Sequence, residues 1–489
     1  MISRMRRIMC ISTLASAIAL MAALSCSEVT PDTPVEENPT VTRTMTVQES
    51  VEIENAAGQF CIEVEANFEY WANPQVKWIT FDRIEGNKVW FNVEENTQMA
   101  ARVGTVKFAD IKDSYFNKTA TVTQKGDPTA RFTLSLVDKN ATAETKALYA
   151  NLWKLAEDGF MFGHHDDLWY GRYWYNEPGN SDTKAVCGDY PAVFSVDFGA
   201  IMDDRYQSEE NAIRRRVIIE AYDRGEVITA CCHLNNPLTG GDSWDNSRND
   251  VVRSILTEGN VTRIKYLQWL DRCAEFANNL KGSDGKLIPV IFRPYHEHTQ
   301  TWSWWGSKCT TEDEFIRFWK FTIEYLRDTK GVRNFIYAIS PQMDEDYGSA
   351  VRDRLTFRWP GDNYVDFLGM DCYHYSWKAA FRSNLIAMSA LSKEKKKPCG
   401  VTETGPEGFN WRDYWTNHIL ECAKGQRVSM IVMWRNKYVG SNEADRHFYS
   451  VYPGHESEDD FRTMYDDPAT FFSEDLPDMY TMPESYDVK

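Results

Sequence analysis

The segment Leu287–Glu297 reads LIPVIFRPYHE, an apolar run that ends in polar and ionisable side chains. A short run rich in Ile and Val is typical of a buried β-strand. Arg293, His296 and Glu297 follow it, at the point where the strand would leave the core. A strand that ends in such side chains is typical of a fold that carries its site on one face. The fold class therefore depends on how often this arrangement recurs.

Seven further short apolar runs have the same form, and helical segments separate most of them. The runs are residues 160–163, 192–196, 227–230, 335–339, 365–370, 399–402 and 429–433, and the expected helices include 144–157, 210–224, 260–279 and 311–329. Eight strand–helix units are the number in a (β/α)8, or TIM, barrel. A doubly wound open sheet would usually carry a Gly-rich phosphate loop after a strand, and the sequence has none. We therefore predict an α/β fold of the TIM-barrel type.

Polar side chains follow all eight predicted strands. In chain order the strand ends are His164–Asp167, Asp197, His233, Arg293–Glu297, Ser340–Gln342, Asp371–His374, Thr402–Gly405 and Trp434–Asn436. One such end could be a capped loop or a hydrogen-bonded core residue. In a barrel, however, all the carboxyl ends of the strands meet on the catalytic face. Eight polar ends together predict a functional site there.

Two carboxylates stand out among these ends, Glu297 after the fourth strand and Glu403 after the seventh. Those strands lie on opposite walls of a barrel, so both side chains can flank one bond. Cleavage of a glycosidic bond needs such a pair, one group to protonate the leaving oxygen and one to act at the anomeric carbon. Either Glu alone could equally belong to a structural ion pair. The pair together predicts a glycoside hydrolase.

Aromatic residues near Glu297 also favour a sugar ligand. Trp302, Trp304 and Trp305 follow within eight residues, and an indole face stacks on the apolar face of a pyranose. Adjacent residues cannot all face one cleft, so we expect one of the three in the core. Polar partners for sugar hydroxyls are available from His233, His296 and Arg435, and Tyr373 could bond the second oxygen of Glu403.

These motifs together resemble glycoside hydrolase family 26, from about Arg131 to the C-terminus. The residues that carry the resemblance are Arg293–Glu297 with Trp302 and Trp304–Gly306, Val365–Tyr373, Thr402–Gly405 and Trp434–Asn436. The family is dominated by retaining β-1,4-mannanases. The resemblance implies Glu297 as acid/base, Glu403 as nucleophile, and a mannan endo-1,4-β-mannosidase type of activity on mannan, glucomannan or galactomannan.

The resemblance also implies substrate-binding residues. His296 would lie beside the acid, Tyr373 would hydrogen-bond the nucleophile, and Trp244 would be a platform on the aglycone side. The remaining candidates for substrate binding are His233, Trp302, Trp434, Arg435, Asp371 and His165. The pair His164-His165 departs from the His-Gln type of pair expected after the first strand.

No metal or cofactor is expected. The cluster His164–Asp167 lacks a matched ligand on another strand, and ligand number and geometry decide a metal site. The 11 Cys show no zinc-site spacing, and Cys231, Cys232, Cys372 and Cys399 lie in apolar stretches typical of core residues.

The N-terminus predicts export. Residues 1–25 combine a basic start with an apolar run, which is typical of a signal peptide. Small residues precede Cys26, as in a bacterial lipobox, so we predict lipidation at Cys26; ordinary cleavage near Ser25 is the alternative. Residues 26–41 are polar and Pro-rich, typical of a tether. These features predict an outer-membrane or cell-surface lipoprotein that contacts the membrane only through its lipid. A periplasmic or secreted protein is the alternative.

Residues 42–128 predict a separate small all-β domain, ahead of the barrel at 130–489. Alternating strands are expected at 44–47, 59–64, 89–93, 104–108 and 120–124, a pattern typical of a β-sandwich. The ending Thr121–Gly126 resembles the BACON-type immunoglobulin-like domain, and we interpret this segment as a spacer. The formal net charge of −18 disfavours nucleic acid as a partner.

Three other functions remain open from the sequence. The same scaffold could cut β-1,3-xylan or a mixed-linkage β-glucan, because the loops around the cleft decide the substrate. A glycan-binding surface lipoprotein that has lost activity is less favoured, since both Glu are present. A purely structural barrel is disfavoured further.

Overall fold

The computed structural model describes residues 42–489 except 344–348, 374–377, 441 and 443, so Cys26 and the predicted signal and tether lie outside the described residues. The described chain forms two compact units, one of residues 42–96 and 101–126 and one of residues 97–100 and 127–489. Among the described residues no helix is both long enough and apolar enough to cross a membrane.

The N-terminal unit contains two four-stranded sheets. One has the order β1 (Met45–Val47), β3 (Gly58–Ala66), β6 (Lys88–Val93) and β5 (Ile79–Glu85), and the other has the order β2 (Ser50–Ile53), β8 (Asn117–Gln124), β7 (Arg102–Asp110) and β4 (Tyr70–Pro74). Alternate side chains of the long strands are buried, such as Ile62 and Val64 on β3 and Phe91 on β6. They form one apolar core, as the period-two pattern predicted.

Three strands of this unit were not expected, and each has a weak pattern. Only Ile79 of β5 is buried, and the register of β5 against β6 shifts between Phe81 and Arg83. β2 and β4 contain no fully buried residue. Such short or irregular edge strands give little periodic signal, because most of their side chains face solvent.

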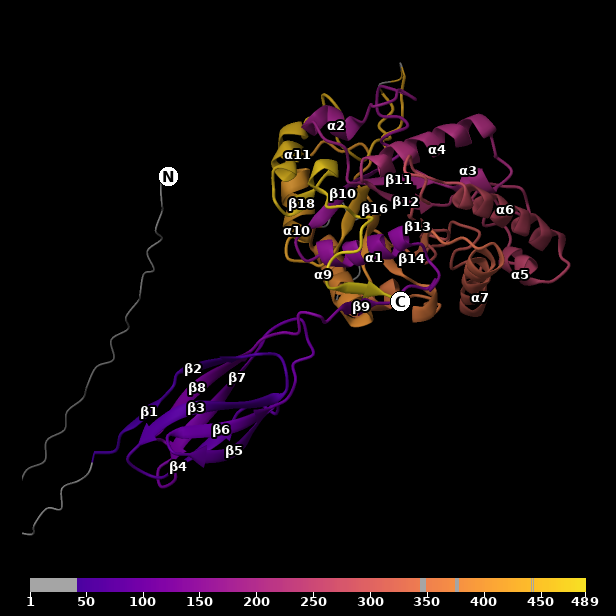
Figure 1. The fold of residues 1–489 in the computed structure, drawn as a ribbon. Helices are drawn as coiled ribbons and strands as arrows, with labels where there is room; N and C mark the ends of the chain where they lie inside the picture. Colours follow the sequence, from indigo (N-terminus) through magenta and orange to yellow (C-terminus); the bar gives the residue numbers. More distant parts are fainter. Residues whose placement is uncertain (1–41, 344–348, 374–377, 441, 443) are drawn as a thin grey trace, which may run out of the picture. The chain divides into compact units, whose positions relative to one another are not determined.

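The C-terminal unit is a closed barrel of eight parallel strands, which confirms the predicted fold class (Figure 1). Around the barrel the strands are β10 (Phe160–His165), β11 (Val193–Asp197), β12 (Val227–Cys231), β13 (Val290–Arg293), β14 (Phe335–Ile339), β15 (Phe367–Asp371), β16 (Cys399–Thr404) and β17 (Met430–Met433). β10 closes the ring by pairing with both β17 and β11. Each of the eight apolar runs identified from the sequence is one of these strands.

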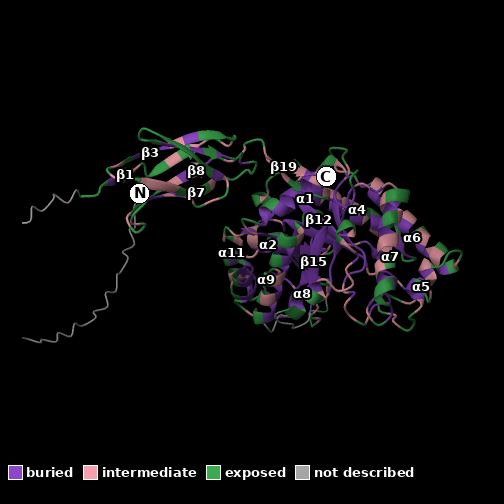
Figure 2. Ribbon diagram, turned by 90° about the horizontal axis from the view of Figure 1, so that it is seen from below, coloured by how far each residue is buried: buried purple, intermediate pink, exposed green. Residues whose placement is uncertain are grey.

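Helices surround the barrel, and their exposed faces contrast with the buried strands (Figure 2). They are α1 (Ala143–Leu155), α2 (Asp182–Cys187), α3 (Gly199–Met202), α4 (Ser208–Asp223), α5 (Val251–Leu256), α6 (Val261–Asn278), α7 (Glu312–Glu324), α8 (Ser349–Leu355), α9 (Lys378–Lys395), α10 (Glu421–Ala423) and α11 (Glu458–Tyr465). Thr311 and Glu314 form a capping box at the start of α7. The helix expected to run to Thr329 changes to a π-helical turn at Tyr325–Thr329.

Three short strands complete the unit. β9 (Phe132–Leu134) pairs with β19 (Tyr486–Val488), which joins the two ends of this unit, and β18 (Thr470–Phe471) pairs with the start of β10. Gly163 on β10 has a structural reason to be Gly. A Cβ there would lie 2.8 Å from Cγ2 of Val432 and 3.0 Å from Cβ of Val193, so the two neighbouring strands leave no room for a side chain.

Candidate active site

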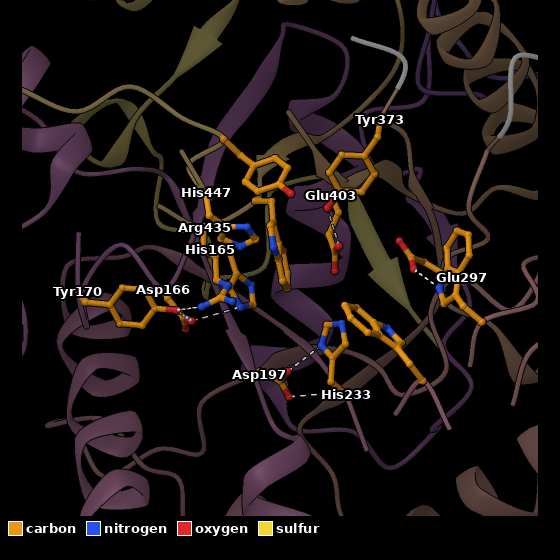
Figure 3. A pocket seen from close by; sticks show the side chains of 14 residues that line it. His165, Asp166, Tyr170, Asp197, His233, Glu297, Tyr373, Glu403, Arg435 and His447 are labelled. Carbon is orange, nitrogen blue, oxygen red and sulfur yellow. Dashed lines mark hydrogen bonds and ion pairs between the residues drawn. The ribbon is translucent and has the colours of Figure 1, made fainter. Parts of the chain in front are cut away.

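A pocket of about 680 Å³ lies at the carboxyl ends of the barrel strands (Figure 3). Its lining residues are His165, Asp166, Tyr170, Asp197, His233, Trp244, Glu297, Trp302, Tyr373, Glu403, Trp434, Arg435, His447 and Tyr449. All the predicted catalytic and substrate-binding residues belong to this wall except His296 and Asp371. The pocket therefore brings together residues that lie more than 250 positions apart in the chain, as the convergence of strand ends in a barrel requires.

Glu403, on β16, is held by two hydrogen-bond donors. The guanidinium of Arg293 bonds its Oε1, and the hydroxyl of Tyr373 donates to its Oε2 at 2.9 Å. Charge-assisted bonds of this kind stabilise negative charge on a carboxylate and limit its rotation. Glu403 is therefore presented to the pocket in one orientation, although it is only 3% exposed.

Asp371 lies below the pocket rather than on its wall. It accepts a hydrogen bond from Nη1 of Arg293 at 2.9 Å, and the hydroxyl of Thr402 donates to it at 2.8 Å. Arg293 and Asp371 are both fully buried. Because a buried charge needs a partner, Asp371 holds Arg293 under Glu403. Asp371 was expected to bind substrate, but it is buried and does not belong to the pocket wall.

Glu297, directly after β13, has an unusual backbone. Its φ of 56° lies in the left-handed region, which is uncommon for residues other than Gly and is concentrated at functional sites. Its amide donates to the carbonyl of Ser340 at 2.8 Å. Burial, followed by the charges of Glu403 and Asp371, raises the pKa of Glu297 well above its ordinary value. Glu297 is thus a carboxylic acid that remains protonated when an ordinary Glu would be ionised.

Only one of the three neighbouring indoles faces the pocket. Trp302 lines it and donates its Nε1–H to Oε2 of Glu297 at 2.9 Å. Trp304 and Trp305 are both buried, and their ring N–H groups donate to the carbonyls of Leu234 and His296. Two of the three are therefore core residues, where one was expected. The Trp302 bond lowers the pKa of Glu297 and partly opposes the effect of burial.

Two histidines lie between Glu403 and Asp197. Nδ1 of His233 lies 2.7 Å from Oδ2 of Asp197, and its Nε2 lies 3.1 Å from Nε2 of His296. His296 is buried behind His233, with its Nε2 4.0 Å from Oε1 of Glu403. Burial, with the nearby charges of His233 and Arg293, lowers the pKa of His296 well below its ordinary value, so this ring is neutral. His233 contacts the pocket directly, and His296 supports it.

The end of the pocket farthest from Glu297 is polar and aromatic (Figure 3). The hydroxyl of Tyr170 donates to Asp166 at 2.5 Å, and Arg435 donates to the same hydroxyl at 3.3 Å. The ring of His165 lies 4.1 Å from that of Trp434, measured between centroids. Trp244, by contrast, is 65% exposed and lies on a loop that bonds the segment after Glu297, where the amide of Trp304 donates to the carbonyl of Ser243.

His164 and His165 have different surroundings, because successive residues of a strand face opposite sides. His165 faces the pocket and its Nδ1 bonds Ser195 at 2.8 Å. Nδ1 of His164 instead lies 2.9 Å from Oδ1 of Asp167, which in turn accepts a bond from the amide of Asp182. The four residues His164–Asp167 therefore do not share one set of ligand atoms.

Several lining residues were not identified as site residues from the sequence. Asp197 was noted only as a strand end, and its partner His233 lies 36 residues away. Asp166 belonged to the cluster after β10, but Tyr170 follows it in a loop without periodic pattern. His447 and Tyr449 likewise come from the long loop after β17. No local signal marks these residues, because only the closing of the barrel places them at the pocket.

The fold and the pocket together define a (β/α)8 barrel with a carboxylate pair in an aromatic cleft, which is the architecture of a glycoside hydrolase. The protein-family model for glycosyl hydrolase family 26 matches residues 137–403 of this chain. The chain belongs to this family.

Proteins similar to this chain include several mannanases. A GH26 β-mannanase structure from Bacteroides ovatus is 38% identical, with a TM-score of 0.65, and covers 70% of this chain and 98% of that chain. A modular endo-β-1,4-mannanase from Cellulomonas fimi is 30% identical, with a TM-score of 0.64 and coverage of 72% and 81%. A mannan endo-1,4-β-mannosidase from Bifidobacterium adolescentis is 29% identical over 68% of this chain. The match spans only 35% of that relative and 59% of the next, from Caldalkalibacillus mannanilyticus.

Proposed function

We propose that this protein is a retaining glycoside hydrolase that cleaves β-1,4-mannosidic bonds in mannan, glucomannan or galactomannan. The observation that carries the proposal is the contrast between two carboxyl groups in one pocket. Burial keeps Glu297 protonated, whereas Glu403 is bonded by Arg293 and Tyr373. A carboxyl group that is kept protonated, beside a second one that is held by two hydrogen-bond donors, forms an acid–nucleophile pair. The mannan specificity is supported by the names of the similar proteins.

The reaction would proceed in two displacements. Glu297 donates its proton to the glycosidic oxygen while an oxygen of Glu403 attacks the anomeric carbon, so the leaving chain departs as an alcohol and a glycosyl ester forms on Glu403. Glu297, now ionised, then removes a proton from water, and this water releases the sugar with its original configuration. Tyr373 and Arg293 hold the attacking carboxylate in line, while Trp302 and His233 border the reacting sugar.

A reducing-sugar assay on a panel of polysaccharides tests the function. We expect reducing sugar to be released from galactomannan and glucomannan at least about 100-fold faster than from β-1,3-xylan and lichenan. This ratio corresponds to a difference of ~2.7 kcal/mol in transition-state binding. Preferential release from xylan or lichenan would instead support the same-family xylanase or mixed-linkage glucanase. Binding of these glycans without any release would identify a non-catalytic surface lipoprotein.

Trp302→Phe tests the assignment of the acid through pH dependence. Phe keeps an aromatic face but removes the N–H that bonds Oε2 of Glu297. That bond lowers the pKa of Glu297, so its loss should raise the pKa further. Since glycosylation needs protonated Glu297, the basic limb of the kcat/KM profile should move to higher pH.

The matched control for this measurement is Trp244→Phe. It removes the indole N–H of another residue that lines the same pocket, and Trp244 is not among the groups that shift the pKa of Glu297 most. Its basic limb should coincide with that of the wild type. A limb that stays in place in Trp302→Phe, or moves to lower pH, would contradict the role of Glu297 as acid.

The N-terminal unit would serve as a BACON-type spacer. The unit has two sheets of mostly antiparallel strands around one apolar core, which supports its assignment as an immunoglobulin-like sandwich. In this proposal residues 1–25 are a signal peptide, 26–41 a lipid-anchored linker, 42–128 the spacer and 130–489 the hydrolase, which places the enzyme at an outer membrane or cell surface.

Lipidation at Cys26 is testable by metabolic labelling. Cys26 follows a signal-like run and precedes a polar tether, so a labelled fatty acid should enter the wild-type protein and be absent from Cys26→Ser. Cys61→Ser, which changes a Cys within the strand-rich unit, serves as the control and should be labelled like the wild type. Equal labelling of Cys26→Ser and the wild type would exclude the anchor.

A further inference from the structure

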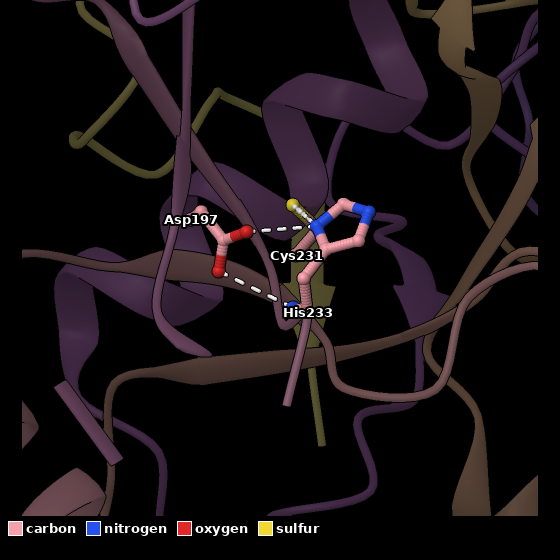
Figure 4. A group of neighbouring side chains, drawn as sticks. All are labelled: Asp197, Cys231 and His233. Carbon is pink, nitrogen blue, oxygen red and sulfur yellow. Dashed lines mark hydrogen bonds and ion pairs between the residues drawn. The ribbon is translucent and has the colours of Figure 1, made fainter. Parts of the chain in front are cut away.

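Three side chains with different ligand atoms converge at the ends of β11 and β12 (Figure 4). Nδ1 of His233 lies 2.7 Å from Oδ2 of Asp197 and 3.8 Å from Sγ of Cys231. All three ligand atoms lie within 4.8 Å of one another. In Figure 4 the carboxylate and the sulfur lie on the same side of the imidazole, where its Nδ1 points.

The strand register explains why these residues meet. Asp197 and Cys231 are direct partners in the parallel ladder between β11 and β12, so their side chains face the same way. His233 follows Cys231 by two residues, so its side chain faces the same side as that of Cys231. Cys232 faces the opposite side, with its sulfur 3.8 Å from that of Met202. The cluster is therefore built by the barrel itself.

We propose that Asp197, Cys231 and His233 form a binding site for a borderline-soft divalent cation of the Zn²⁺ or Cd²⁺ class. Thiolate, imidazole and carboxylate are the ligands these ions prefer, at about 2.3 Å for sulfur and 2.0–2.2 Å for nitrogen and oxygen. Tetrahedral bonds of those lengths separate the ligand atoms by roughly 3.3–3.6 Å. To reach that spacing the Asp197 carboxylate would move outward from its 2.7 Å contact with Nδ1 of His233, and the Cys231 sulfur would move slightly inward from 3.8 Å.

Cation binding at this cluster would be an exchange for protons. A divalent cation would replace the Nδ1 proton between His233 and Asp197 and the thiol proton of Cys231, and both protons would leave to solvent. The total charge is conserved, and the Nε2–H of His233 stays directed at His296.

A second group of ligand atoms does not offer the same opportunity. His296, Asp371 and Glu403 also converge, and all three are buried. Their space already contains a cation, however, because the guanidinium of Arg293 bonds both Asp371 and Glu403. A metal there would have to displace a buried ion pair, whereas the first cluster gives up only protons.

The site would couple metal binding to the proposed hydrolysis, and this consequence rests on the proposed function. Asp197 and His233 both line the pocket, with Cys231 buried beneath them. A bound cation would replace the hydrogen bond between His233 and Asp197 on the pocket wall and would occupy space beside the reacting sugar. Zn²⁺ should therefore inhibit. The charged and titratable groups that face the cluster are Arg205, Arg293, Glu403, His165, His296 and Arg435.

Titration of the full chain with Cd²⁺ alone tests the site without reference to activity. The wild type should bind one Cd²⁺ with the ultraviolet charge-transfer absorption of a Cd²⁺–thiolate bond. Cys231→Ser and Cys231→Ala should lose this absorption and bind at least about 10-fold more weakly, while Cys232→Ser, the neighbouring buried thiol, should behave like the wild type. Because two protons leave per cation, affinity should fall by up to roughly 100-fold for each unit that the pH is lowered.

Inhibition supplies the second readout. Zn²⁺ should inhibit the wild type and Cys232→Ser, and at least about 10-fold more Zn²⁺ should be needed for Cys231→Ser, whose activity without metal should be unchanged. Absence of the thiolate absorption in the wild type, or a Cd²⁺ affinity of both Cys231 variants equal to that of the wild type, would overturn the site. Failure to hydrolyse mannan with the absorption intact would instead refute the proposed function and leave the site standing.

Discussion

Glu403→Ala is expected to lose hydrolysis of every β-mannoside, with kcat lowered at least about 10,000-fold, which corresponds to ~5.5 kcal/mol in the barrier. Among the described residues that line the pocket, Glu403 is the carboxylate bonded by both Arg293 and Tyr373, so it is the group placed to form the glycosyl ester. The loss should be equal for polymer and for substrates with activated leaving groups, because both need the same nucleophile. Initial rates on galactomannan and on a dinitrophenyl mannoside measure this.

Folding must be separated from chemistry in this experiment. Removing Glu403 leaves Arg293 paired only with Asp371 in a fully buried position, and breaking such a pair is costly. Glu403→Gln keeps the volume and a hydrogen-bond acceptor, so its thermal unfolding should show whether the barrel is intact. Glu421→Ala, at an exposed ion pair with Lys378, is the control and should retain full activity. Appreciable turnover of polymer by folded Glu403→Gln would exclude Glu403 as nucleophile.

Glu297→Ala should separate substrates by their leaving groups. Hydrolysis of polymer should fall at least about 1,000-fold, or ~4.1 kcal/mol, because a sugar alkoxide does not leave without a proton. A dinitrophenyl mannoside needs no protonation, so its first step should stay near the wild-type rate. The second step should become rate-limiting, since water then lacks its base. A burst of dinitrophenol followed by slow turnover would show this sequence.

The opposite pattern would contradict the assignment. If Glu297→Ala slowed the burst on the dinitrophenyl substrate as much as it slowed polymer hydrolysis, Glu297 would not be the proton donor. The backbone of Glu297 bears on the choice of variant, because its φ of 56° is unfavourable for Ala. Glu297→Gln keeps the side-chain volume and the bond from Trp302, so it provides the second variant.

The barrel was predictable because its strands are buried on both sides and are short, apolar and followed by polar residues. This pattern identified all eight strands, and the convergence of their ends indicated most of the pocket wall. The strand-rich unit was predicted less fully. β2, β4 and β5 contribute few buried side chains, so their periodicity is weak.

The deeper parts of the site were not predictable in the same way. Arg293 belongs to the segment that decides the fold, yet its partners Asp371 and Glu403 lie 78 and 110 residues later. The sequence placed Asp371 among the substrate-binding residues, because nothing local distinguishes a strand end that faces the pocket from one that faces the layer below it. The bond from Trp302 to Glu297 could not be predicted either, because its effect on the pKa of Glu297 depends on where the indole N–H points.

The stereochemistry of azide rescue tests the carboxylate assignment most directly. Glu297→Ala, incubated with a dinitrophenyl β-mannoside and azide, should give the β-mannosyl azide, because azide replaces water in the second displacement and needs no base. Glu403→Ala under the same conditions should give only the α-azide, because azide then attacks in place of the missing nucleophile. NMR of the products separates the two anomers. An α-azide from Glu297→Ala, together with intact polymer hydrolysis by Glu403→Ala, would contradict the assignment of both residues.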